Sequence, residues 1–140
     1  MKTLPRWLSI VDQFLQGKYT DALRGMRTTR LSNTSITSAR KVHGMITLSL
    51  ERVRTLLSGV VDETRKELAK QLLMRSIILV NYLAERDVLD RDFANAISGK
   101  LESIIANIDG RKYQVATELS IKLRIFLDAI IAFKYKQLKG

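Results

Sequence analysis

The residue types best suited to chemistry lie between Ala22 and Leu50, a stretch that contains no acidic residue. Five cationic side chains stand there among serines, threonines and an asparagine: Arg24, Arg27, Arg30, Arg40 and Lys41. Guanidinium groups bind phosphate oxygens through paired hydrogen bonds, and hydroxyl and amide groups can fill the spaces between them. The stretch therefore predicts a phosphate-rich polyanion as the partner of this chain.

The distribution of charge favours the same class of partner. The net charge is +10, and the first 58 residues hold 10 Lys and Arg against 3 acidic residues, whereas the rest hold 14 against 11. Nucleic acid is the partner that this asymmetry implies, with an anionic membrane surface and a merely solvated basic face as alternatives. No aromatic residue lies inside the acid-free stretch, so the predicted contacts are to the nucleic-acid backbone rather than to stacked bases.

The only histidine, His43, is the first candidate for acid–base catalysis. Its spacing from Arg40 does not reproduce the Arg-x4-6-His signature of helical nucleases that cut RNA. A single histidine in a basic helix is more typical of a nucleic-acid contact, and we interpret His43 in that way.

A group of carboxylates at a helix junction is the candidate for binding Mg²⁺: Glu85, Asp87, Asp90 and Asp92. Aspartate at such a junction is expected as a helix cap, and Arg86 and Arg91 lie among these residues to neutralise their charge. The chain also lacks cysteine and any glycine-rich phosphate loop. We therefore expect no metal, no cofactor, no small-molecule substrate and no enzymatic activity.

The elements that must position the basic residues are predicted to be helices, because apolar residues recur with a helical period and the chain has one proline. The expected fold is all-α, a single compact bundle of about five helices over residues 1–140. Helices are predicted over 5–17, 37–58, 62–86, 90–109 and 111–138, with a short element at 19–26. A basic polar loop at about 27–36 is the candidate flexible segment.

The helix that follows this loop carries the predicted nucleic-acid face. Ser35 or Thr37 is expected as its N-cap and Gly59 as its stop. One side of the helix collects residues at spacings of three and four: Arg40, His43, Thr47, Glu51 and Arg54. The other side is expected to be apolar: Val42, Ile46, Val53, Leu57 and Val60. The predicted RNA-binding residues are Arg24, Arg27, Arg30, Arg40, Lys41, His43 and Arg54.

The later helices are expected to form the core. Residues 62–86 carry an apolar stripe that is broad enough to predict the centre of the bundle: Leu68, Leu72, Ile77, Ile78, Leu79, Val80 and Leu83. The last helix has a near-heptad line, Val115, Leu119, Leu123, Phe126, Ile130 and Phe133, and ends on Lys134, Lys136 and Lys139. These lysines are either a secondary basic patch or cations that the helix dipole favours.

Three short stretches resemble a known family, the small helical subunit of type III CRISPR effector complexes, and the III-A form in particular. The run Phe126 to Tyr135 (FLDAIIAFKY) is similar to the family's closing pattern. Tyr82 and Arg86 stand at its Tyr-x3-Arg, and Thr37-Ser38 before Arg40-Lys41 is similar to the start of its basic helix. The resemblance covers residues 36 to 137.

The resemblance implies a non-catalytic helical bundle in an RNA-guided complex of antiviral defence. Family members stack head to tail inside the complex and face the duplex of guide RNA and target RNA, so the implied partners are RNA, other complex subunits and copies of the same chain. Arg40 and Lys41 correspond to the basic start of the nucleic-acid-facing helix.

An alternative is a membrane-surface or general nucleic-acid-binding scaffold, since a basic helical hairpin also suits anionic lipid. Leu31 and Ile36 are isolated among polar neighbours, which disfavours membrane insertion, and flotation with liposomes distinguishes the two classes. The N-terminus has no long apolar run and the chain no membrane-length one, so we expect a cytoplasmic protein without a membrane partner.

Overall fold

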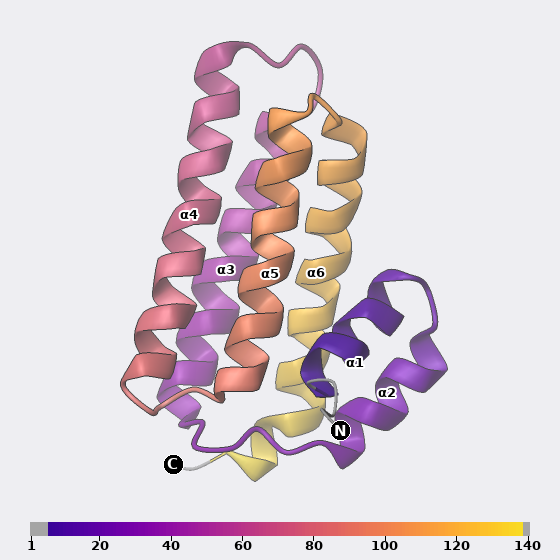
Figure 1. The fold of residues 1–140 in the computed structure, drawn as a ribbon, viewed down its shortest axis with the longest axis vertical. Coiled ribbons are helices and arrows are strands. Elements are labelled where there is room, and N and C mark those ends of the chain that lie inside the picture. The colour runs from indigo at the N-terminus through magenta and orange to yellow at the C-terminus, as the bar shows by residue number, and fades with distance from the viewer. Residues whose placement is uncertain (1–5, 139–140) are drawn as a thin grey trace, which may run out of the picture.

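The all-α prediction is confirmed by the computed structural model, which describes residues 6–138 (Figure 1). Within this range the chain forms six helices and a final 3-10 turn at Tyr135–Gln137. The helices are α1 (Arg6–Leu15), α2 (Tyr19–Thr28), α3 (Ile36–Leu56), α4 (Glu63–Glu85), α5 (Arg91–Asp109) and α6 (Tyr113–Lys134). The count exceeds the expected five because the short element after Gly17 is a full helix, α2.

Polar caps begin three of these helices where the sequence predicts them. Ser35 Oγ accepts a hydrogen bond from the backbone N–H of Ser38, so Ser35 rather than Thr37 caps α3. The carboxylates of Asp62 and Asp90 accept from Arg65 and Phe93 in the first turns of α4 and α5. Such bonds satisfy backbone N–H groups that have no partner within the helix.

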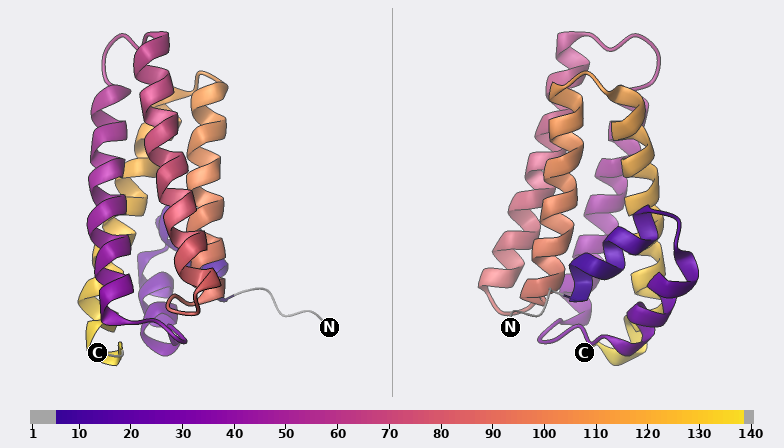
Figure 2. Two further views of the ribbon diagram at one scale, coloured as in Figure 1. Left: turned by 90° about the vertical axis from the view of Figure 1, so that its left-hand side faces the viewer. Right: turned by 45° about the vertical axis from the view of Figure 1, so that its right-hand side comes forward.

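Helices α3 to α6 form an up-and-down four-helix bundle. Consecutive helices pack side by side, and α6 closes the bundle against α3. The shorter α1 and α2 lie against one end of this bundle, where α1 packs on α5 and α6 and α2 packs on α6 (Figures 1 and 2). Gly25 permits close contact between α1 and α2, because a Cβ there would lie 2.8 Å from Ile10 Cγ1.

The centre of the molecule is α6 rather than the predicted helix at 62–86. Helix α6 packs against four others, and α1 and α2 cover part of its outer side. Helix α4 packs against α3 and α5, and it leaves Leu68 and Ile78 at 46% and 56% exposure. The stripe on α4 is broad because it faces both the core and the outside. The prediction that Val60 belongs to the apolar side of the 37–58 helix was also wrong, since Val60 lies in the α3–α4 loop and is exposed.

The loop between α2 and α3 covers residues 29–35, because Arg27, Thr28 and Ile36 of the predicted loop belong to the helices, and it forms hydrogen bonds to the rest of the protein. The Asp90 carboxylate accepts a hydrogen bond from the backbone N–H of Ser32 at 2.8 Å, and Thr34 Oγ1 accepts one from the backbone N–H of Asp90 at 2.9 Å. The N–H of Ser35 donates to the carbonyl oxygen of Val88 at 3.1 Å. These hydrogen bonds attach the loop to the α4–α5 turn. The loop crosses one end of the bundle, where α3 and α5 begin and α4 and α6 end, and we call this end the base.

Candidate nucleic-acid interface

Two of the predicted arginines meet aromatic rings at the end of α6. The Arg27 guanidinium carbon lies 5.2 Å from the centroid of the Phe133 ring, and that of Arg40 lies 5.5 Å from the centroid of Tyr135. Arg40 also donates a hydrogen bond to the Tyr135 hydroxyl at 2.7 Å. We call these four residues the arginine–aromatic row. Its geometry lies within the range of cation–π contacts.

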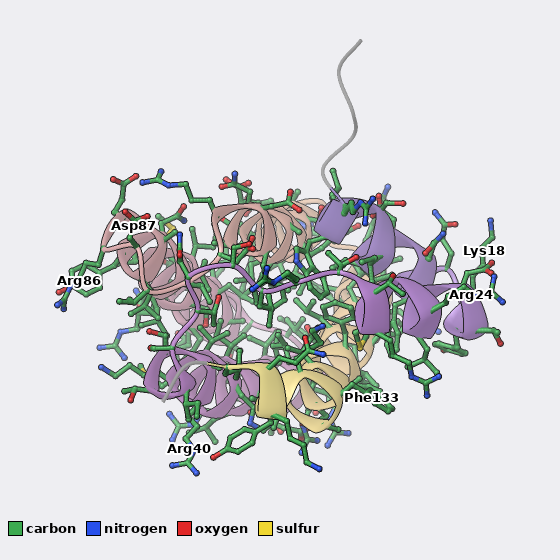
Figure 3. The ribbon with its side chains drawn as sticks, turned by 90° about the horizontal axis from the view of Figure 1, so that it is seen from below. Lys18, Arg24, Arg40, Arg86, Asp87 and Phe133 are labelled. Atoms are coloured by element: carbon green, nitrogen blue, oxygen red, sulfur yellow. The ribbon has the colours of Figure 1, made fainter. Side chains whose placement is uncertain are left out.

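The burial of Lys134 explains how one helix end presents aromatic residues to both α2 and α3. Neighbouring residues on an α-helix are about 100° apart around its axis. Because the Lys134 side chain is directed inward and is fully buried, Phe133 and Tyr135 emerge on opposite flanks of α6. Arg40 and Phe133 accordingly lie on opposite sides of the end of α6 in Figure 3. Lys134 is therefore not part of the secondary basic patch.

The other arginines of the acid-free stretch are dispersed. Arg24 lines a hollow between α1 and α2 together with Arg6, and in Figure 3 it lies beside Lys18 on a different edge from Arg40. Arg30 lines a separate hollow at the base with Gln137. Arg24 thus lies far from Arg40 but one helical turn before Arg27 on α2, whereas Arg30 is separate from the row; both are exposed.

Lys41 is exposed but is turned away from Arg40, because the two are adjacent positions of α3. It stands one helical turn before Met45, which lines a hollow between α3 and α4. The resemblance treats Arg40 and Lys41 as a pair, whereas in the fold they lie on different sides of α3.

The upper part of the predicted basic face is a polar seam between α3 and α6. His43 Nε2 lies 2.7 Å from Asp128 Oδ1, and Glu51 binds both Arg54, at 3.0 Å, and Arg124. The hydrogen bond from Arg54 and the charge of Arg124 hold the pKa of Glu51 below its ordinary value. Thr47 is buried and donates to the carbonyl oxygen of His43. The acid-free stretch of the sequence therefore has a carboxylate beside it in the fold, because Asp128 of α6 contacts His43. Arg54 is paired with Glu51 on its own helix.

The two arginines of the row differ from His43 and Arg54 in their charge environment. Among residues 6–138, neither Arg27 nor Arg40 forms an ion pair with an acidic side chain. A cation held against an aromatic ring keeps donor groups free for a phosphate, and the ring edge is free for a ribose or a base. Phe133 is 42% exposed. The row can therefore accept an anionic, partly aromatic ligand.

Sequence reasoning missed Phe133 and Tyr135 as parts of the interface because it searched for rings near the arginines in sequence. The directions of the predicted helices could have indicated these two rings. In an up-and-down bundle the fourth helix ends beside the start of the first, so the end of α6 must lie near Arg40. Tyr82 and Arg86 form a third such pair at the end of α4, where Arg86 donates to the Tyr82 hydroxyl at 3.2 Å.

The carboxylates between α4 and α5 take up structural positions. Asp90 caps α5, Asp92 accepts a hydrogen bond from the backbone N–H of Trp7 at 3.0 Å, and Glu85 pairs with Arg91. Asp87 is in the left-handed region, with φ 58°. Within the described part of the chain, no group of three or more His, Cys, Asp or Glu side chains has the arrangement of a metal site.

Comparison with models of protein families, with curated proteins and with solved structures finds no match to this chain. Over residues 6–138, no helix combines the length and the apolar character that crossing a bilayer requires.

Proposed function

We propose that this chain is a non-catalytic RNA-contacting subunit that meets RNA at the base of its bundle. The observation that carries the proposal is the arginine–aromatic row, in which Arg27 and Arg40 are exposed, are oriented by Phe133 and Tyr135, and have no carboxylate partner within residues 6–138. Phosphate contacts of this kind give affinity and orientation without sequence preference. Arg24, Arg30 and Lys41 extend the basic surface on the sides of the row.

The more specific proposal is the small subunit of a type III CRISPR interference complex. It is supported by the family resemblance, and two of its three motif stretches touch each other, because Arg40 contacts Tyr135. The helical bundle is also the fold that the resemblance implies. In this role the chain would lie along guide and target RNA, next to other subunits and copies of itself, in the cytoplasm.

The RNA proposal is tested by removing the two arginines of the row. Replacing both, in Arg27→Ala/Arg40→Ala, is expected to weaken binding of a labelled RNA of mixed sequence about tenfold near 0.1 M salt. A plot of the logarithm of the binding constant against the logarithm of the salt concentration should also become less steep by roughly 1.5, because each phosphate contact contributes about 0.7–0.9 to the magnitude of its slope. Fluorescence anisotropy over a series of salt concentrations, with single-stranded RNA and an RNA duplex, measures both quantities.

The matched control removes two exposed arginines from another side of the bundle, in Arg52→Ala/Arg75→Ala. This variant has the same net charge and is expected to bind RNA within about twofold of the unmodified chain, since distant charges are screened beyond about 10 Å at 0.1 M salt. Equal losses in the two variants, or binding that salt leaves unchanged, would contradict a contact at the base.

The CRISPR proposal needs a separate experiment. We expect the native chain, isolated under mild conditions from the cells that produce it, to carry a guide RNA and further protein subunits. Isolation as a monomer free of RNA would contradict that identity, while the anisotropy series would still decide whether the base of the bundle binds RNA.

A further inference from the structure

One side of the bundle exposes large apolar side chains on two neighbouring helices. Met45 and Leu48 on α3 are 53% and 55% exposed, and Leu68 on α4 is 46% exposed. No other helix stands in front of α3 and α4 in the left-hand view of Figure 2. Exposed apolar groups gathered in this way mark interaction surfaces rather than ordinary surface variation.

The exposed side is hollowed into a groove along α3 and α4. A hollow of about 610 Å³ has Leu56, Leu68 and Leu72 among its lining residues. A second one, of about 170 Å³, includes Met45, Leu48, Leu72 and Leu79. The two hollows share Arg52, Leu72 and Arg75, so they form one continuous groove between the helices.

The groove is basic as well as apolar. Arg52 of α3 and Arg75 of α4 are exposed on it, and neither forms an ion pair within residues 6–138. Glu51 is the single carboxylate among the residues that line the two hollows, and its charge is already satisfied by Arg54 and Arg124. A ligand of the groove therefore meets an apolar floor and two cations without counter-ions.

The protein covers the opposite side of the bundle with a helix of its own. Helix α1 packs on α5 and α6 and buries Trp7, Ile10, Val11 and Phe14. The α3–α4 side has no such covering helix among the described elements. It offers two antiparallel helices with apolar residues at heptad spacings, the surface against which an amphipathic helix packs.

We propose that the α3–α4 groove binds an amphipathic helix of another protein, with an apolar stripe flanked by Asp and Glu. The apolar stripe would cover Leu48, Leu68 and Leu72, and the flanking carboxylates would pair with Arg52 and Arg75. The apolar floor disfavours RNA as the occupant. A symmetric dimer through the groove is disfavoured because it would bring the unpaired arginines of two +10 chains together. The proposal is independent of RNA binding at the base.

The test uses a synthetic amphipathic helix as a probe of the full chain. Its leucines recur at spacings of i, i+3, i+4 and i+7 with glutamates beside them, and a second peptide has lysines in place of the glutamates. We expect the acidic peptide to bind at least about tenfold more tightly than the basic one. Charge reversal in Arg52→Glu/Arg75→Glu should invert that preference, because like charges then oppose each other.

The matched control reverses two exposed cations at the starts of α1 and α2, in Arg6→Glu/Lys18→Glu. It changes the net charge equally and places acids where the helix dipole favours them. We expect binding of the acidic peptide within about twofold of the unmodified chain. Equal loss in both variants, no binding of the acidic peptide, or equal binding of both peptides would overturn the proposal. So would sedimentation showing a dimer that Arg52→Glu/Arg75→Glu abolishes, since a second copy would then fill the groove.

Discussion

Replacing Asp90 by alanine is expected to lower the free energy of unfolding by about 2–4 kcal/mol, because one buried carboxylate serves two segments. Its Oδ1 caps α5 at the N–H of Phe93, 2.9 Å away, and its Oδ2 accepts from the N–H of Ser32 at 2.8 Å. The side chain is only 8% exposed, so water replaces neither bond well. Chemical denaturation monitored by circular dichroism measures the loss.

The companion measurement follows the loop over residues 29–35. Without Asp90 the N–H of Ser32 loses its partner, and amide hydrogen exchange in the loop is expected to rise before the bundle unfolds. The control is Asp62→Ala, which removes an exposed cap that accepts only from Arg65 and should cost about 1 kcal/mol. If the two variants were equally destabilised, Asp90 would be a simple cap, and the loop would be held by other contacts.

The sequence predicted the helices well because their ends carry local signals. Asp62 and Asp90 cap their helices through side-chain oxygens, and Gly59 has the positive φ, 71°, expected just beyond the end of α3. These signals involve residues within a few positions of one another. The position of a helix in the bundle has no local signal. The stripe on α4 predicted the centre of the core, yet its Leu68 lines the outer groove and its Ile78 is exposed.

The candidate site was less predictable than the fold, because its charges are set by segments far apart in sequence. No acidic residue lies close to Arg40 and His43 in the sequence. Asp128 lies 85 positions beyond His43, yet it contacts His43 in the fold. Phe133 and Tyr135 are likewise far in sequence from the arginines that they contact. A charge pattern along one helix predicts a face of that helix, but the neighbouring helix decides whether the face stays basic.

The second large effect is expected at Lys134, whose ammonium is buried. Its side chain is fully buried, and its Nζ forms no hydrogen bond in the described part of the chain. Lys134→Met keeps a long flexible side chain and removes the charge. We expect it to raise the free energy of unfolding at pH 7 by about 1–3 kcal/mol, the usual cost of an unsatisfied buried polar group. The control Lys136→Met, at an exposed neighbour, should change stability by less than about 0.5 kcal/mol.

The gain in stability from Lys134→Met should depend on pH, and the burial of Lys134 determines the direction of that dependence. Loss of hydration lowers the pKa of Lys134 from its ordinary value of 10.5 in the folded protein. The unfolded chain therefore binds the proton more tightly, and between the two pKa values a rise in pH favours the folded state. The advantage of Lys134→Met is expected to shrink through that interval and to become constant above about pH 10.5, where the amine is neutral in both states and only its uncharged N–H groups stay unsatisfied. Denaturation of both proteins from pH 7 to pH 11 measures the difference. A variant less stable than the unmodified chain at pH 7 would mean that the ammonium is stabilised where it lies, and Lys134 would then hold the end of α6 through its charge.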